Sequence, residues 1–206
     1  MRLQVIVGST RPGRAADNVV PWVVSRAALQ PEFELEVLHL RDWPLPMFGE
    51  HPGSIGDRRN PSYSDEIVRR WNRKIAEADA YVIITPEYNH SVPGELKNAI
   101  DSVFISFAFR NKPLAAIGYS GGIRALEHLV QIATEVEAVP LRSTVVLPFV
   151  DKAFGDDGEP ADPMTEFSLQ ILLEDLAWWA RALHDARATG ELAPGRIRAR
   201  LAAAAS

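Results

Sequence analysis

Five short runs of apolar and β-branched residues alternate with longer segments of helical period along the chain. The runs lie at residues 3–8, 33–40, 80–85, 113–120 and 141–148. Near-continuous apolar strands separated by helices are typical of a parallel sheet that helices cover on both faces. The pattern therefore predicts an α/β fold with five strands.

The second run differs from the others because Phe33, Leu35 and Val37 alternate with two glutamates. Such alternation indicates a strand with one polar face, so we expect it at or near an edge of the sheet. Five strands with intervening helices favour a doubly wound sheet, either Rossmann-like or flavodoxin-like with the strand order 2-1-3-4-5.

The helices follow from the same periodicity. Ser64 is the predicted N-cap of a helix that places Trp71 and Ile75 on one face. A C-terminal helix carries a leucine stripe and leaves Trp178 outside it, either exposed or against another subunit. Pro21 lies inside the helix predicted after the first strand and should kink it.

Three stretches show no regular period, at residues 41–63, 150–163 and from 190 to the end. Long loops in a compact domain are often functional. No composition shift marks a domain boundary, so we expect one domain over residues 1–190 and a C-terminal tail over 191–206.

Composition and charge narrow the function classes. The 206 residues include no cysteine, which excludes disulfides and thiolate chemistry and fits a cytoplasmic setting. A formal charge of −5 argues against a nucleic-acid partner. No secretory signal pattern follows Met1 and no apolar run could span a bilayer, so we expect no membrane partner.

The first strand leads into "GSTRPGR" at residues 8–14. Small residues, the hydroxyl of Ser9, the charges of Arg11 and Arg14, and a following helix N-terminus together favour an anion. The loop lacks the lysine of a triphosphate-binding loop and lacks G-x-G-x-x-G, so a terminal monophosphate fits better than a triphosphate or a pyrophosphate. An ordinary turn with solvated arginines is the alternative.

The third strand leads into "TPEYNHSVPGELKNAID" at residues 85–101. Pro86 fixes the direction of the chain, and Glu87, Tyr88 and Asn89 add hydrogen-bonding groups and a ring edge. We expect a shaped wall against which a flat heteroaromatic ring could lie.

The fourth strand leads into Tyr119 and then Ser120, Gly121 and Gly122. Two successive glycines permit unusual dihedral angles or a close approach of a ligand to the backbone. Because ligands of doubly wound sheets bind beyond the carboxyl ends of the strands, we expect the three motifs to meet there.

Taken together, "GSTRPGR", "TPEYNHSVPGELKNAID" and "YSGG" resemble the NADPH-dependent FMN reductase family, which includes quinone, azo-dye and chromate reductases. The likeness extends over about residues 1–185, and "LRDWPLPMF" at 40–48 is similar to the family's loop after the second strand. The resemblance implies a flavodoxin-like three-layer αβα fold with FMN as cofactor and NADPH or NADH as electron donor.

The resemblance also implies roles for the motif residues. Within the first motif, Ser9, Arg11 and Arg14 would hold the FMN phosphate, although many relatives have a small hydroxyl residue in place of Arg14 and an asparagine in place of Ala16. The remaining predicted contacts are with the isoalloxazine ring: Pro86, Glu87, Tyr88 and Asn89 on one side, partly through the backbone, and Ser120, Gly121 and Gly122 on the other side or at the edge.

The implied activity is a ping-pong transfer of electrons to a small acceptor such as a quinone, an azo compound, a metal oxyanion or free flavin. Relatives are usually homodimers or homotetramers, and Trp43, Phe48 and Phe154 are candidate walls of the acceptor site. The alternative is an FMN-binding electron carrier or regulatory module without nicotinamide chemistry.

Other chemistry finds little support in the sequence. No ligand spacing links the histidines into a metal site, and no nucleophile elbow G-x-S-x-G is present. His90 could face the ring or be an ordinary loop residue. We expect no catalytic side chain, because the flavin would carry the redox chemistry.

Overall fold

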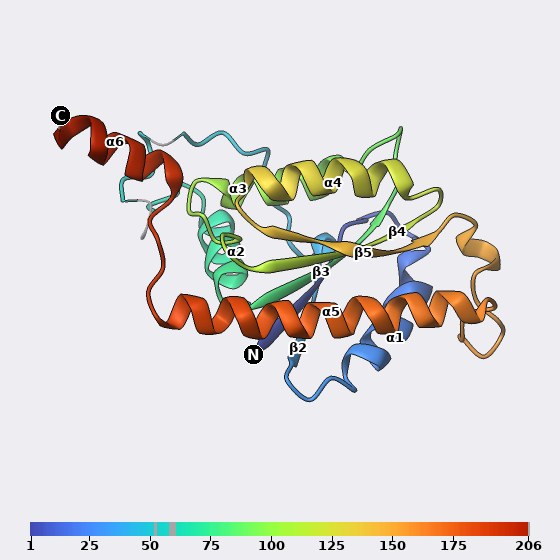
Figure 1. Ribbon diagram of the computed structural model, residues 1–206. Helices are drawn as coiled ribbons and strands as arrows, with labels where there is room; N and C mark the ends of the chain where they lie inside the picture. Colours follow the sequence, from blue (N-terminus) through green and yellow to red (C-terminus); the bar gives the residue numbers. More distant parts are fainter. Residues whose placement is uncertain (52, 58–60, 206) are drawn as a thin grey trace.

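The computed structural model describes residues 1–51, 53–57 and 61–205, and four positions of the predicted irregular stretch 41–63 lie outside this range. Within it the chain forms one five-stranded parallel sheet in the order β2-β1-β3-β4-β5 (Figure 1). The strands are β1 (Arg2–Val7), β2 (Glu34–His39), β3 (Ala80–Pro86), β4 (Pro113–Tyr119) and β5 (Val139–Leu147). The predicted flavodoxin-like strand order is confirmed.

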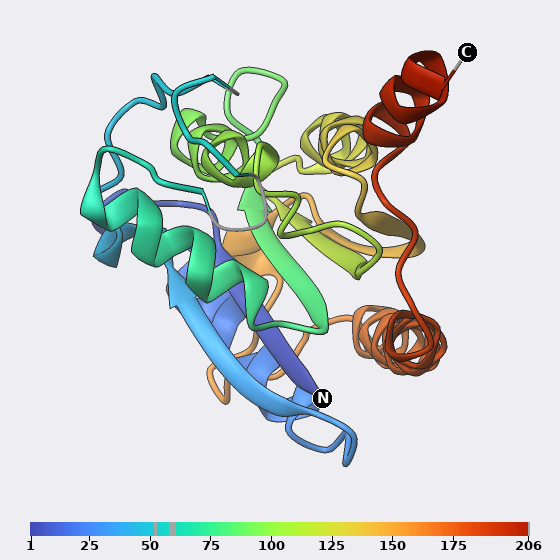
Figure 2. The same ribbon diagram turned by 90° about the vertical axis from the view of Figure 1, so that its left-hand side faces the viewer.

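Helices cover both faces of the sheet. The α-helices are α1 (Ala16–Ala27), α2 (Glu66–Ala76), α3 (Gly94–Phe104), α4 (Ile123–Glu135), α5 (Pro163–Ala188) and α6 (Gly195–Ala205), and 3-10 turns span Leu40–Asp42 and Val150–Lys152. One core cluster joins α1 and α5 to the sheet, and a second joins α2, α3 and α4 to the opposite face (Figure 2). This is the predicted three-layer arrangement.

The burial of the strands follows their position in the sheet. Every residue of β3 and β4 is buried, whereas β2 is mostly half-buried. The alternating sequence of β2 thus belongs to an edge strand, as predicted, and the continuous apolar runs belong to central strands.

Helix boundaries depart from the sequence predictions in two places. The N-cap of α2 is Asp65, not Ser64, because the Asp65 carboxylate accepts a hydrogen bond from the Ile67 amide at 2.9 Å. The Ser64 amide instead donates to Glu50 at 2.7 Å. The tail from residue 190 was expected to be irregular, but it contains α6.

The C-terminal tail lies at the amino end of the strands. After α5 the chain crosses this end of the molecule, and α6 extends from the body (Figures 1 and 2).

Among the described helices, none has an apolar stretch long enough to cross a membrane. Pro21 lies inside α1, as predicted, and the helix continues past it to Ala27.

Candidate functional site

The carboxyl ends of β1, β3 and β4 meet around a small pocket of about 170 Å³, which we call the strand-exit pocket. Its lining residues come from the loops after all three strands: Arg11, Pro12, Gly13, Arg14, Ala15, Pro86, Tyr88, Tyr119 and Ser120. The three motifs predicted from the sequence therefore converge in space, as the topology of the sheet requires.

The loop between β1 and α1 presents unpaired backbone donors. The N-cap of α1, Ala15, makes no side-chain capping bond. In the described part of the chain, the amides of Gly13, Arg14 and Ala15 donate no hydrogen bond. Gly13 has a φ of 65°, a conformation that glycine adopts without strain. Unpaired amides at a helix N-terminus favour an anion.

Ser9 and Arg11 connect this loop to the next one. The buried Ser9 hydroxyl lies 2.9 Å from the Tyr88 hydroxyl, within hydrogen-bond distance. The exposed guanidinium of Arg11 lies over the Tyr88 ring, 5.3 Å from its centroid. Arg11 thus adds a positive charge to the lining of the pocket.

Arg14 has a different environment. Its side chain is 1% exposed, and its guanidinium donates to the Ser9 carbonyl, to Asp17 at 3.0 Å and to His39 Nδ1 at 2.8 Å. Burial and the Arg14 charge lower the pKa of His39, which keeps Nδ1 free to accept. Arg14 therefore ties the loop to α1 and β2, partners that sequence reasoning did not identify.

The chain after β3 makes a tight turn. The amides of Tyr88 and Ser91 each donate to the carbonyl of the other, at 2.8 and 3.0 Å. Between them Asn89 and His90 have φ values of 50° and 67°, as in a type I′ turn. The amides of these two tip residues find no acceptor in the described part of the chain, so they form an exposed donor pair. His90 itself is an exposed turn residue.

Glu87 acts as a structural link through its side chain. Its carboxylate accepts from the Arg124 amide at 3.1 Å and from the Arg124 guanidinium at 2.9 Å, and only 8% of the side chain is exposed. Burial alone would raise the pKa of Glu87, but the hydrogen bonds and charge of Arg124 outweigh it and lower the pKa. The carboxylate is thus engaged with α4, so contact with a ring would have to involve the backbone.

The chain after β4 is held in an unusual conformation. Ser120, Gly121 and Gly122 have φ values of 54°, 92° and 84°. The Ser120 amide donates to the carbonyl of Leu147 at the end of β5, at 3.0 Å. The Gly121 amide donates to the carbonyl of Pro148, the next residue, also at 3.0 Å. These two amides are therefore unavailable to a ligand, and the Ser120 side chain is the group that can reach the pocket.

The aromatic residues predicted as walls of an acceptor site are dispersed. Trp43 packs on Trp71 and lines a second pocket of about 300 Å³ beside Thr10. Phe48 packs edge-on against Tyr63, and Phe154 packs on Trp22 of α1. Of the three, Trp43 is the one that shares a pocket with a residue of the first motif, Thr10.

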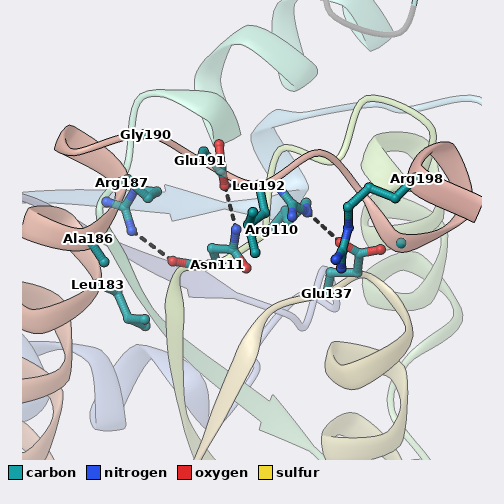
Figure 3. A pocket seen from close by; sticks show the side chains of 11 residues that line it. Arg110, Asn111, Glu137, Leu183, Ala186, Arg187, Gly190, Glu191, Leu192 and Arg198 are labelled. Atoms are coloured by element: carbon teal, nitrogen blue, oxygen red, sulfur yellow. Dashed lines mark hydrogen bonds and ion pairs between the residues drawn. The ribbon is translucent and has the colours of Figure 1, made fainter. Parts of the chain in front are cut away.

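The largest described pocket, about 590 Å³, lies at the opposite end of the sheet, between the end of α5 and the tail (Figure 3). Some of its lining residues bond to one another: Arg110 donates to Glu137, and Asn111 donates to Glu191 at 2.6 Å. Neither this pocket nor any other group of described residues gathers three or more possible metal ligands. The strand-exit pocket is lined by residues from each predicted motif, namely Arg11, Arg14, Pro86, Tyr88 and Ser120. The other predicted site residues are not among its lining residues: Ser9, Glu87, Asn89, Gly121 and Gly122.

The fold defines a flavodoxin-like protein, with unpaired amides and Arg11 at the exit of its first strand. Residues 1–152 match the family described as NADPH-dependent FMN reductase, and the chain belongs to that family. This confirms the resemblance to a family of oxidoreductases that use FMN and NAD(P)H.

The chain is similar to two named reductases over part of their length. An NAD(P)H-dependent FMN reductase of Schizosaccharomyces pombe is 36% identical over 120 residues, which make up 58% of each chain. A quinone reductase of Escherichia coli is 37% identical over 101 residues, 46% of this chain and 54% of that protein. The chain thus spans little more than half the length of these relatives.

Solved structures extend the similarity. FerB, a flavoenzyme NAD(P)H:(acceptor) oxidoreductase from Paracoccus denitrificans, is 28% identical with a TM-score of 0.70, covering 88% of this chain and 97% of its own. An archaeal flavodoxin, 12% identical with a TM-score of 0.54 over 88% of this chain and 99% of its own, shares the fold.

Proposed function

We propose that this protein is an FMN-dependent oxidoreductase that takes electrons from NADPH or NADH and passes them, by a ping-pong mechanism, to a small acceptor. A quinone, an azo compound, a metal oxyanion or free flavin would suit such an enzyme. The observation that carries the proposal is the convergence of the three strand exits on one pocket in a chain of this family. The similarity to a quinone reductase supports the choice of acceptors.

The residues of the pocket fit FMN. Unpaired amides at the start of α1, the exposed charge of Arg11 and the buried hydroxyl of Tyr119 line a space suited to an anion. The Tyr119 hydroxyl has no partner in hydrogen-bond geometry in the described part of the chain. When bound, FMN would supply the hydride and electron transfer that no amino-acid side chain provides.

The protein's own groups would hold and orient the cofactor. We assign Ser9, Arg11 and the loop amides to the phosphate, with Arg14 supporting the loop from behind. The exposed amides of Asn89 and His90 would donate to polar atoms at the edge of the ring. Glu87 would fix the turn by its bonds to Arg124, and the nicotinamide and the acceptor would occupy the same open face in succession.

A visible spectrum of the purified protein tests the proposal. We expect a flavin absorption band after incubation with FMN, bleaching of that band when NADPH is added under argon, and steady NADPH oxidation with menadione as acceptor. A flavin band without turnover would favour an electron carrier. A protein that binds no FMN would rule the proposal out.

We further propose a homodimer or homotetramer, with one catalytic domain over residues 1–190, working in the cytoplasm. Phe167, Ile171 and Trp178 lie on the outer side of α5 with 44 to 59% of their surface exposed, which leaves an apolar face for a partner. The absence of cysteine from the sequence fits a reducing compartment. Light scattering after gel filtration would measure the oligomeric state.

A further inference from the structure

Tyr119 carries a buried hydroxyl group without a partner. The residue is 2% exposed at the end of β4, and its hydroxyl makes no hydrogen bond in the described part of the chain. Most buried polar groups in proteins are hydrogen-bonded, and leaving one unpaired is destabilising. The hydroxyl is thus a group for which the folded chain itself offers no structural role.

The surroundings of the hydroxyl place it on the phosphate-loop side. The polar groups that act on it are Ser9, Tyr88, Arg14 and Asp17, all on or beside the loop after β1 and the turn after β3. Tyr119 also lines the strand-exit pocket together with Arg11 and the loop residues 12–15.

The neighbouring polar groups already have partners. The Ser9 hydroxyl is close to that of Tyr119 but is within bonding distance of Tyr88, and the Arg14 guanidinium is bonded to Ser9, Asp17 and His39. No described neighbour meets the Tyr119 hydroxyl in hydrogen-bond geometry, although the Ser9 hydroxyl is near enough to lower the pKa of Tyr119. Burial raises the pKa of Tyr119 to about 12, so the hydroxyl keeps its proton at neutral pH and can donate.

We infer that the Tyr119 hydroxyl donates a hydrogen bond to the terminal phosphate of bound FMN. The inference rests on the proposed function. An anion is the fitting acceptor, because the amides of residues 13–15 and the Arg11 charge line the same pocket from another side. The sequence motif "YSGG" would then contribute a phosphate ligand from its first residue, in addition to its predicted contacts with the ring.

Equilibrium binding of two flavins to Tyr119→Phe tests this assignment. FMN and riboflavin differ by the phosphate, so we expect Tyr119→Phe to raise the dissociation constant for FMN about tenfold, as removal of a hydrogen bond to a charged group does. The dissociation constant for riboflavin should stay within about twofold of the wild-type value. Both are measured by quenching of flavin fluorescence.

The matched control is Tyr63→Phe, which removes another buried tyrosine hydroxyl outside the pocket, one that bonds to Asn72 at 2.9 Å. It should leave both dissociation constants unchanged. The melting temperature of Tyr119→Phe without flavin should not fall, because the variant loses no hydrogen bond.

Three results would overturn the inference. FMN affinity that is unchanged in Tyr119→Phe would remove the hydroxyl from the phosphate site. An equal loss for FMN and riboflavin would assign Tyr119 to the ring or the ribityl chain. A wild-type protein that binds neither flavin would instead refute the proposed function, and the inference with it.

Discussion

At the scale of single residues, the two arginines of "GSTRPGR" have opposite environments. Arg14 is buried with three partners inside the protein, whereas Arg11 is exposed and lies over Tyr88. The sequence predicted the same role for both. We therefore propose that Arg11 binds the ligand and that Arg14 supports the loop.

Arg11→Ala should weaken FMN binding without destabilising the protein. The substitution removes a charge-assisted bond to the phosphate, worth about 1.5 to 3 kcal/mol, so the dissociation constant for FMN should rise at least tenfold. Fluorescence quenching measures the affinity, and a thermal scan without flavin measures the stability. An unchanged FMN affinity would exclude Arg11 from the site.

Arg14→Ala should have the reverse pattern, with a marked loss of stability before any flavin is added. It leaves the Ser9 carbonyl and His39 Nδ1 without their donor in a buried region, which costs about 2 to 4 kcal/mol. Urea unfolding of the flavin-free protein measures the loss. A variant as stable as the wild type, with FMN binding abolished, would show that Arg14 is a direct phosphate ligand after all.

We expect Lys112 to make the stability depend on pH. Its ammonium group donates to the Ala76 carbonyl at 2.9 Å, and burial lowers its pKa to about 8, against 10.5 for an exposed lysine. Below pH 8 both the folded and the unfolded chain carry the proton, and the folded chain bears the penalty of the buried charge. Above pH 8 the folded chain releases the proton first, so stability increases with pH up to about 10.5.

We therefore expect the free energy of unfolding to rise by about 1 to 2 kcal/mol between pH 8 and 9.5, since each pH unit in this window contributes up to about 1.4 kcal/mol. Lys112→Met, which keeps an unbranched side chain one atom shorter and without the charge, should lack the rise. Urea unfolding at several pH values measures both profiles. Parallel profiles for the two proteins would contradict the assignment to Lys112.

At the scale of elements, the strands and their order were predictable because central strands of a parallel sheet are apolar throughout. The edge position of β2 followed from its alternating glutamates. The N-cap of α2 was not predictable, since Ser64 and Asp65 are both good caps and the choice depends on Glu50, which binds Ser64 from a distant loop.

The site also has a part that the sequence predicts and a part that it does not. The motif residues could be assigned to one pocket because each follows a strand. Their side-chain partners could not, because Arg14 meets His39 and Glu87 meets Arg124 only after the chain has folded. Tyr119 was recognised as part of a motif, but its unpaired hydroxyl depends on burial that the sequence does not show.

The conformation after β4 gives a prediction about Gly122. A Cβ atom there would lie 2.7 Å from the Gly118 carbonyl carbon, and φ is 84°, so Gly122→Ala should destabilise the protein by about 2 kcal/mol or more. Gly94→Ala is the control, because a Cβ at Gly94 meets nothing within 4 Å at the start of α3. Melting temperatures compare them; equal values for both variants would show that the loop tolerates a side chain.

At the scale of the whole molecule, different features lie at the two ends of the sheet. The strand exits form the predicted flavin site, whereas the amino end supports the C-terminal tail (Figure 1). Glu191 ties the tail to the body, since it accepts from Asn111 at 2.6 Å and lies 3.1 Å from an Arg110 nitrogen (Figure 3). The site and the tail share no pocket in the described chain.

A chain that ends at Thr189 should therefore bind FMN as tightly as the full chain. Its melting temperature should fall by a few degrees, because Arg110 and Asn111 lose a partner while the sheet and α1 to α5 keep their contacts. Glu191→Gln in the full chain is the control, since it weakens the same link without removing α6. A truncated chain that lost its affinity for FMN would show that the tail takes part in the site, either within one chain or across an oligomer, and would contradict a domain limited to residues 1–190.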